Sequence, residues 1–176
     1  MAERSILPAT GTQIGHYACV SADDKMRELV DLEEIRQLYA RYCHAGDSGD
    51  CDTFAQCFTE DAVVDSNGSL SKGRDAIRTT CESYRHVNAA TPMRHVTVNI
   101  LVSVNGDEAQ ASSYFLLLAT GAEPGVLRTG TYNDRLRRAE GRWCLSERVA
   151  RSDGGALISL DVPDLATTVG EDGHDG

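Results

Sequence analysis

The sequence lacks any long run of apolar residues. Hydrophobic residues make up 41% of its 176 positions, an ordinary share for a globular protein, yet no run approaches the roughly 18 consecutive apolar residues that a membrane-spanning helix requires. Residues 1–5 also lead into no apolar stretch of the kind that a secretory signal contains. We therefore expect a cytoplasmic protein that has no membrane partner.

Positive charge is scarce as well. Lys and Arg number 17 against 27 Asp and Glu, and the formal net charge is -10. Nucleic acids and anionic membranes are bound by clustered Lys and Arg, so this balance argues against both as partners. Part of the acidity belongs to residues 156–176, which contain five acids and no Lys or Arg, and it therefore says little about a functional site.

Paired cysteine motifs are absent too. The six cysteines are scattered and include no Cys-x-x-Cys sequence. The irregular spacing of Cys43, His44, Cys51 and Cys57 matches no familiar pattern of zinc ligands. We expect buried free thiols and no metal or other cofactor.

Helical periodicity dominates the first half of the sequence. Apolar residues recur at steps of three and four over residues 32–42, which predicts a long amphipathic helix with one buried stripe. Capping sequences at residues 21–24 and 31–34 precede it, and Gly46 and Gly49 end it. A short helix is predicted over 52–58, an extended segment from 62, a turn at 66–68 and a third helix from 73 to about 85.

Strand patterns dominate the second half. Four strands are predicted at about 94–104, 109–120, 126–138 and 142–152, with tight connections at Asn105-Gly106 and Glu140-Gly141. Helices followed by strands are typical of an α+β domain, in which helices pack on one curved, mostly antiparallel sheet. The length suits one domain with a core that can shelter a ligand. We expect an irregular arm over 1–20, this domain over 21–155 and a loose acidic tail over 156–176.

Alternation along the strands assigns side chains to faces. On the strand at 94–104 it places His95 among polar neighbours, opposite the apolar residues Val96, Val98, Ile100 and Val102. On the last strand it places Arg148 on a side with small residues, where a cavity would have room, and opposite Trp143, Leu145 and Val149. The outer apolar face needs cover from helices or from another subunit, so we expect a homodimer or homotrimer.

Four side chains carry the types needed for cofactor-free proton transfer: Tyr42, Asp47, His95 and Arg148. An imidazole moves the proton, a carboxylate orients it, a phenol holds a substrate oxygen and a guanidinium stabilises developing negative charge. Each also has an ordinary structural interpretation: a satisfied strand histidine, a turn aspartate, a core tyrosine and a solvated arginine. His44 offers Asp47 a competing partner within the helix end.

Short motifs follow one another in a fixed order from residue 32 to residue 153. They are Ile35-Arg-Gln-Leu-Tyr-x-x-Tyr42, Asp47-x-x-Asp50, Phe58-Thr-Glu-Asp-Ala62, Gly73-Arg-Asp-Ala-Ile77, His95-x-x-x-Asn99, Gly130-x-Tyr132-x-Asp134 and Gly141-Arg-Trp-Cys-Leu-x-x-Arg148. This series resembles a SnoaL-like domain of the nuclear-transport-factor-2-like superfamily. The resemblance implies a cone-shaped α+β barrel, in which helices close one side of a strongly curved sheet and a pocket opens between them.

The site is similar to those of scytalone-dehydratase-like, bile-acid-dehydratase-like and hexachlorocyclohexane-dehydrochlorinase-like lyases. In these families an Asp at the end of the first helix pairs with a His on the sheet, and Asp47 and His95 stand at the matching positions. Tyr42 matches a catalytic Tyr of the bile acid dehydratases, and Arg148 matches an active-site Arg of the dehydrochlorinases.

The resemblance therefore implies a cofactor-independent, dehydratase-like lyase or isomerase. Its small-molecule substrate would be apolar or alicyclic and would carry a carbonyl or hydroxyl group. The superfamily leaves two alternatives open, because one fold serves several functions. One is a polyketide-type or epoxide-opening cyclase that uses the same pocket. The other is a non-catalytic ligand-binding module, such as the small subunit of an oxygenase.

Overall fold

The fold consists of helices packed on one side of a single curved sheet. The structure is a computed structural model that describes residues 21–90 and 92–153, so the predicted arm and tail lie outside the described residues. The elements are α1 (Ala22–Ser48), α2 (Cys51–Gln56), β1 (Phe58–Ser66), β2 (Ser69–Lys72), α3 (Arg74–Ala90), β3 (Met93–Asn105), β4 (Glu108–Ala119), β5 (Gly125–Ala139) and β6 (Arg142–Ser152). None of these helices combines the length and apolar character that crossing a membrane would need.

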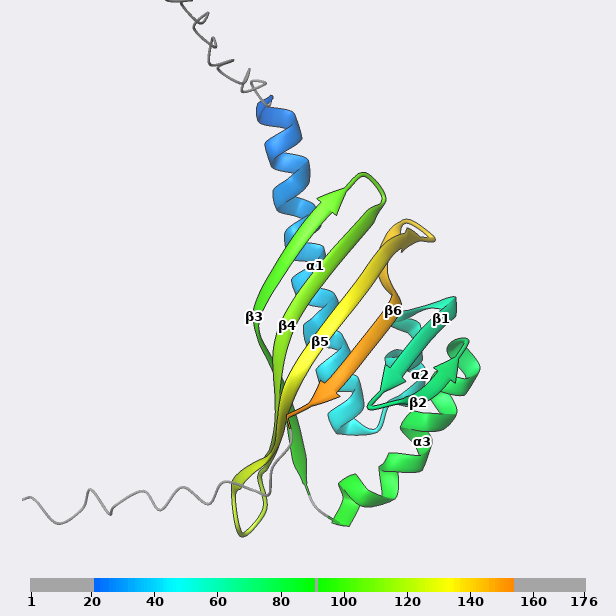
Figure 1. The fold of residues 1–176 in the computed structure, drawn as a ribbon, viewed down its shortest axis with the longest axis vertical. Helices are drawn as coiled ribbons and strands as arrows, with labels where there is room; N and C mark the ends of the chain where they lie inside the picture. The colour runs from blue at the N-terminus through cyan, green and yellow to red at the C-terminus, as the bar shows by residue number, and fades with distance from the viewer. Residues whose placement is uncertain (1–20, 91, 154–176) are drawn as a thin grey trace, which may run out of the picture.

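The sheet has six strands in the order β2-β1-β6-β5-β4-β3. Neighbouring strands run antiparallel except for β1 and β6, which are parallel. The sheet curls around α1 without closing, so β2 and β3 remain its two edges (Figure 1). The α+β fold with a curved, mostly antiparallel sheet is therefore confirmed, and the barrel is an open one.

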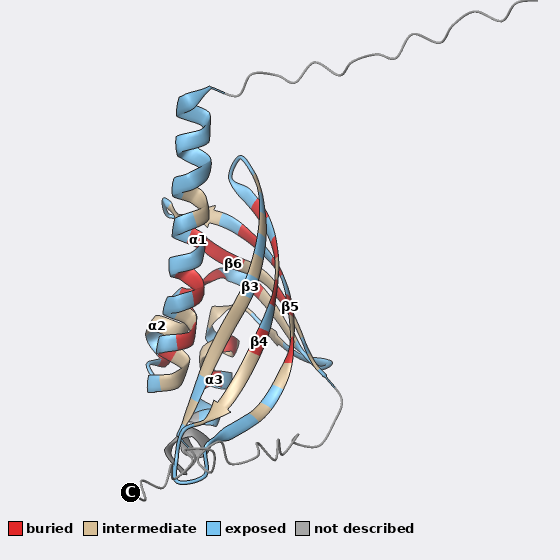
Figure 2. Cartoon of the chain, turned by 90° about the vertical axis from the view of Figure 1, so that its left-hand side faces the viewer, coloured by how far each residue is buried: buried red, intermediate tan, exposed pale blue. Residues whose placement is uncertain are grey.

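Helix α1 sets the position of the candidate site. It begins where the sequence predicts, because the Ser21 side chain accepts a hydrogen bond from the Asp24 backbone N–H at 3.0 Å. The second capping sequence, at residues 31–34, causes no break. The helix ends at Gly49, whose φ of 72° is the left-handed conformation that favours glycine. Its first turns extend past the sheet into solvent (Figure 2), and its last turns lie against β3.

The core lies between α1 and the facing side of the sheet. Ile77 of α3 belongs to the same cluster, so α1, α3 and the sheet share one core. Its buried members include Ile35, Leu38, Tyr39, Phe58, Ala62, Ile77, Leu136, Trp143 and Leu145. The burial of Leu38 and Tyr39 confirms the apolar stripe predicted for the first helix.

A bulge in β3 reverses the predicted alternation of its side chains. Val98 pairs with Tyr114 and Leu101 pairs with Ser112. Between these pairs β3 has two residues, whereas β4 has only one, Ser113. Asn99 lies in this bulge with a φ of 53°. Ile100, Val102 and Val104 therefore pack against the core, on the same face as His95. The prediction that Val96, Val98, Ile100 and Val102 share one side is wrong, because the extra residue exchanges the two faces.

A second bulge, in β6, also exchanges the two faces of its strand. Its pairing with β5 passes from Leu145 to Glu147 and leaves Ser146 without an opposite residue. Leu145 and Arg148 consequently both face the helices, where Arg148 contacts the rings of Tyr39 and Tyr42. The prediction that Arg148 and Leu145 lie on opposite faces is wrong for this reason.

A disulfide joins α2 to α3. Cys51 and Cys81 are bonded, with their Cα atoms 5.6 Å apart. Cys43, Cys57 and Cys144 are free and buried. The prediction of free thiols is thus correct for these three and wrong for the bonded pair, and the sixth cysteine, Cys19, lies outside the described residues. Cys81 also lines the pocket described below, so the disulfide anchors one of its walls.

Replacing Cys51 and Cys81 by serine is expected to lower the free energy of unfolding by about 3 kcal/mol. The disulfide closes a loop between residues 30 apart, and its loss frees the unfolded chain. Urea denaturation under non-reducing conditions measures the difference. Dithiothreitol should destabilise the unchanged protein by a similar amount and leave the double variant unaffected. Equal stability of the two proteins would show that the bond does not form.

Candidate active site

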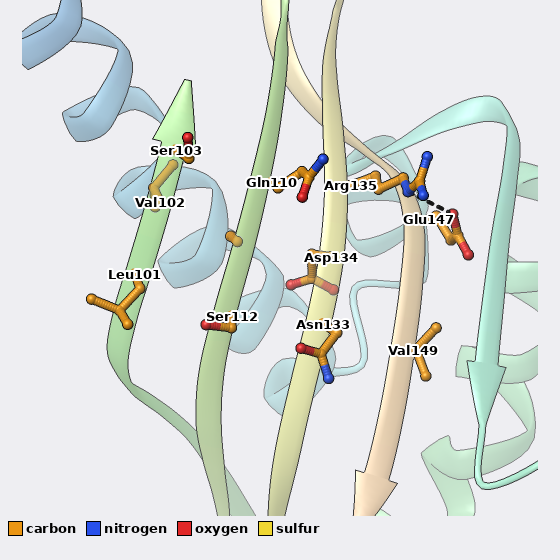
Figure 3. A pocket seen from close by; sticks show the side chains of 11 residues that line it. Leu101, Val102, Ser103, Gln110, Ser112, Asn133, Asp134, Arg135, Glu147 and Val149 are labelled. Atoms are coloured by element: carbon orange, nitrogen blue, oxygen red, sulfur yellow. Dashed lines mark ion pairs between the residues drawn. The ribbon is translucent and has the colours of Figure 1, made fainter. Parts of the chain in front are cut away.

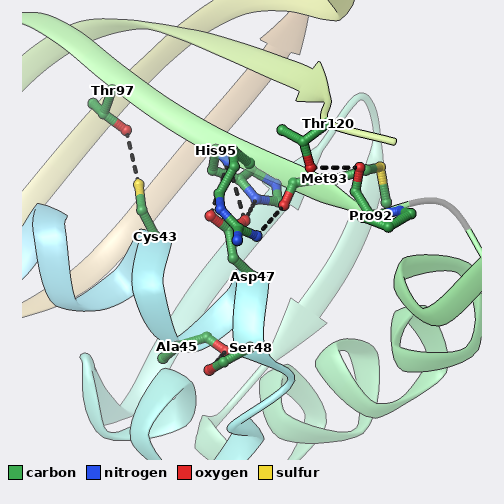
Figure 4. Close-up of polar contacts among 10 residues, drawn as sticks. Cys43, Ala45, Asp47, Ser48, Pro92, Met93, His95, Thr97 and Thr120 are labelled. Carbon is green, nitrogen blue, oxygen red and sulfur yellow. Dashed lines mark hydrogen bonds and ion pairs between the residues drawn. The ribbon is translucent and has the colours of Figure 1, made fainter. Parts of the chain in front are cut away.

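Asp47 and His95 meet where the last turn of α1 crosses β3. The Asp47 Oδ1 atom lies 2.7 Å from the His95 Nδ1 atom (Figure 4). Both carboxylate oxygens also accept from the His95 backbone N–H, at 3.0 and 3.1 Å. The Asp47 side chain is 9% exposed and the His95 side chain is 27% exposed. The pair is therefore sheltered, and the histidine is the member that solvent or a ligand can reach.

This contact determines which ring nitrogen is available for chemistry. A carboxylate oxygen can only accept a hydrogen bond, so the contact places a proton on Nδ1 of His95 and leaves Nε2 as the basic nitrogen. The additional bonds to the His95 backbone fix the carboxylate relative to the strand. His44 is exposed and does not take the place of His95 as the partner of Asp47.

The dyad borders a pocket of about 340 Å³ between the helices and the sheet. Its size is at the lower end of the range for sites that bind small molecules. Aromatic and apolar side chains line much of the wall, namely Tyr42, Phe54, Met93, Phe115, Leu117 and Tyr132. Hydroxyl groups line another part, from Ser66, Ser69, Ser71, Thr80 and Ser152. His95 is on the wall of this pocket, so its imidazole can reach a bound molecule.

Tyr42 lies on the pocket wall, as the site hypothesis requires. Its ring centre is 4.7 Å from that of Phe54 and 6.3 Å from that of Tyr132. Burial raises the pKa of Tyr42, and the positive charge of Arg148 opposes part of this rise. The phenol is therefore protonated at neutral pH and can donate a hydrogen bond to a substrate oxygen.

Arg148 does not line the pocket. Its side chain is 1% exposed and donates to Asp134 through Nε at 2.8 Å and Nη2 at 2.7 Å. The Tyr39 hydroxyl donates to the same carboxylate. Burial alone would lower the pKa of Arg148, but the charge and hydrogen bonds of Asp134 raise it well above its usual value. The expectation of a guanidinium in direct contact with the substrate is therefore corrected: a permanently charged Arg148 lies behind the pocket wall.

Tyr132 is a pocket residue that sequence reasoning missed. It lies on β5, and its ring stacks on that of Phe115 with the centres 4.7 Å apart. Gly130 makes this stack possible, because a Cβ at that position would lie 2.5 Å from the Phe115 ring. The motif Gly130-x-Tyr132-x-Asp134 contained the signal: alternation puts all three residues on one face of the strand.

A hollow of about 460 Å³ lies on the opposite face of the sheet. In Figure 3 its side chains come from the sheet strands, and α1 passes behind them. The ion pair drawn there joins Arg135 to Glu147 at 3.4 Å, and both side chains are exposed. Exposed ion pairs of this kind contribute little energy and create no reactive group. Although this hollow is larger, the pocket beside His95 is the better candidate for chemistry.

The described part of the chain contains no evident set of metal ligands. Among residues 21–90 and 92–153, no three His, Cys, Asp or Glu side chains are placed to hold an ion together. Cys51, which belonged to the irregular zinc pattern weighed from the sequence, is bonded to Cys81 instead.

Comparison with known proteins places this geometry in a family. The profile of the SnoaL-like domain matches residues 27–149. A protein of unknown function from Mycobacterium tuberculosis is 30% identical over 84% of this chain and 86% of its own, with a TM-score of 0.69. An NTF2-like protein with a cystatin-like fold from Novosphingobium aromaticivorans is 26% identical over 81% and 93%, with a TM-score of 0.68.

A third solved structure has a name that points to an activity. It is described as a proposed scytalone dehydratase from Novosphingobium aromaticivorans. It is 25% identical over 74% of this chain and 89% of its own, with a TM-score of 0.64. No protein of curated function matches the sequence.

Proposed function

The chain belongs to the SnoaL-like domain family, and from this membership and the pocket geometry we propose that it is a cofactor-independent, dehydratase-like lyase or isomerase. The substrate is a small apolar or alicyclic molecule that carries a carbonyl or hydroxyl group. The observation that carries the proposal is the contact between Asp47 and His95 on the wall of a pocket of about 340 Å³. A likeness in fold alone would not support a reaction.

The proposed reaction starts at the carbon next to the substrate carbonyl. Nε2 of His95 removes a proton from this carbon, and Asp47 stabilises the imidazolium that forms. The electron pair of the broken C–H bond moves toward the carbonyl oxygen, which accepts a hydrogen bond from Tyr42. Arg148 keeps the surroundings of Tyr42 positively charged without touching the substrate.

The two reaction types differ only in the second step. In an elimination, the enolate electrons return and break the bond from the neighbouring carbon to its hydroxyl group. That group leaves with the proton from His95 as water. In an isomerisation, the substrate carries a carbon–carbon double bond next to the deprotonated carbon, and His95 returns the proton to the far carbon of that double bond, so the double bond moves and nothing leaves. Both sequences balance in atoms and electrons and require only the groups already named.

The pocket supports the substrate class. Its aromatic and aliphatic wall suits an apolar ring, whereas the hydroxyl groups on the remaining wall can bind substituent oxygens. Self-association as a homodimer or homotrimer is also part of the proposal. Leu101 and Tyr114 support it, because their apolar side chains are exposed at 74% and 55% on a strand pair where a second subunit could cover them.

Dehydration of small alicyclic β-hydroxy ketones tests the proposed function. The purified protein is incubated with a panel that starts from 3-hydroxycyclohexanone, and the ultraviolet absorption of the conjugated enone product is followed. Enone formation well above the buffer rate is expected for at least one ring size. Cyclohex-3-enone is included as the substrate for double-bond migration, which would give the same conjugated enone. Absence of acceleration for both the β-hydroxy ketones and this unsaturated ketone would contradict the proposal.

A further inference from the structure

We propose that Tyr132 is a second oxygen-binding residue of the site, and that it holds the substrate oxygen together with Tyr42 while the buried Arg148–Asp134 pair positions and polarises both phenols. This inference rests on the proposed function, since it names the groups that receive the negative charge released by proton removal. It assigns contact with the substrate to the two tyrosines, and it makes Arg148 a positioning residue.

The three side chains form one compact cluster. The guanidinium carbon of Arg148 lies 4.0 Å from the ring centre of Tyr132 and 4.3 Å from that of Tyr42. The two rings are nearly perpendicular, at 83°. Both tyrosines line the pocket that contains His95, and Arg148 does not. The tyrosines can therefore contact a bound molecule directly, whereas Arg148 lies behind them.

One edge of the Arg148 guanidinium faces the Asp134 carboxylate, and the opposite edge has no hydrogen-bond partner. Nε and Nη2 of Arg148 occupy both oxygens of Asp134, which leaves Nη1 at the opposite edge. Nη1 is buried and has no hydrogen-bond partner. A buried donor without an acceptor is uncommon and costly, so its persistence calls for a reason. Here the reason is electrostatic, because a positive edge beside the two phenols favours electron density on a nearby oxygen.

The two phenols share one cation. Each ring centre lies within 4.3 Å of the guanidinium carbon of Arg148. Burial, the largest cause, raises the pKa of both residues, and the charge of Arg148 lowers both. The phenols thus stay protonated, while the adjacent cation strengthens their O–H groups as hydrogen-bond donors.

The ring of Tyr132 is held rigidly. It is stacked on Phe115, and Gly130 leaves room for this contact. A donor that is fixed before the reaction stabilises new negative charge without having to reorient. As His95 takes the proton from carbon, the substrate oxygen gains the electron pair while Tyr42 and Tyr132 both donate to it. No proton has to move from either tyrosine.

Binding of 4-nitrophenolate tests this assignment. The probe presents a single oxyanion on a ring, and its visible absorption shifts when the oxyanion is hydrogen-bonded. It is titrated at a pH where the free probe is ionised. We expect binding to the unchanged protein and an affinity about tenfold lower or weaker still for Tyr132→Phe, because one hydrogen bond to a charged group is lost. Tyr42→Phe should behave alike.

Two controls separate loss of the hydroxyl group from a change of shape. Tyr114→Phe removes a tyrosine hydroxyl that is exposed and outside the pocket, and it should leave the affinity unchanged. Nitrobenzene lacks the oxyanion, so its binding should differ less than twofold between the unchanged protein and Tyr132→Phe. A structural role for Tyr132 would instead weaken both probes equally.

The proposal is overturned if Tyr132→Phe binds 4-nitrophenolate as tightly as the unchanged protein does, if the unchanged protein does not bind it, or if nitrobenzene loses as much affinity. Failure of the proposed function has a different signature. In that case His95→Ala dehydrates the β-hydroxy ketones as well as the unchanged protein does, whatever Tyr132 contributes to phenolate binding.

Discussion

His95→Ala is expected to slow dehydration by about a thousandfold, measured with the β-hydroxy ketone of the panel that the unchanged protein dehydrates fastest. General acid–base catalysis by one positioned side chain contributes roughly 10²- to 10⁴-fold. Removal of the imidazole leaves no basic nitrogen at this place on the pocket wall. The fold should persist, since His95 belongs to the pocket wall and not to the buried core cluster. Initial rates of enone formation under saturating substrate measure the effect.

Asp47→Asn should reduce the same rate by about a hundredfold or more. The carboxamide keeps the shape of the side chain but loses the negative charge that stabilises the imidazolium. Because Asp47 acts through His95, the double variant should be no slower than His95→Ala alone. His44→Ala is the matched control, as His44 is an exposed histidine on the same helix, and it should retain full activity. Full activity in Asp47→Asn and His95→Ala would eliminate the dyad.

Asp134→Ala is expected to destabilise the fold by about 3–5 kcal/mol, the usual cost of removing one partner from a buried ion pair. Its side chain is 0% exposed and accepts from Arg148 and from Tyr39. The variant leaves a guanidinium charge in the interior without a counterion, and the Tyr39 hydroxyl loses its acceptor. Chemical denaturation followed by circular dichroism measures the loss.

The exposed pair of Arg135 and Glu147 supplies a control for this prediction. Their side chains meet at 3.4 Å on the surface, where water and salt screen the attraction. Glu147→Ala should therefore cost about 1 kcal/mol or less. The combined variant Asp134→Leu and Arg148→Met should recover much of the stability, because no unpaired charge remains inside. A loss below about 1 kcal/mol for Asp134→Ala would mean that the pair is not buried in solution.

The elements of the fold were predictable because their signals are local. The apolar steps at residues 32–42, the Ser21 cap and the turns at Asn105-Gly106 and Glu140-Gly141 all lie within a few positions of the structure that they specify. Strand β2 was missed, since four residues carry too little periodicity to identify a strand. The parallel pairing of β1 with β6 joins segments about 85 residues apart, and no local pattern encodes it.

The faces of β3 and β6 were not predictable in the same way. One extra residue, at Asn99 or at Ser146, exchanges the two sides of everything that follows it. For this reason alternation along β6 put Arg148 and Leu145 on opposite faces and did not predict that Arg148 lies beside Tyr132. Residue types alone made Asp47 and His95 candidates for proton transfer, but their direct pairing was predicted only through the family resemblance, since periodicity does not show that a helix end meets a strand.

The most direct test of the central claim, that His95 removes a carbon-bound proton inside this pocket, is the rate of deuterium incorporation next to the carbonyl of a small cyclic ketone. The rate is followed by proton NMR in deuterium oxide for the unchanged protein and for His95→Gln, which keeps a polar side chain but no basic nitrogen. The proposed chemistry predicts exchange well above the buffer rate for the unchanged protein and a loss of at least a hundredfold in the variant. Equal rates for the two proteins would contradict it.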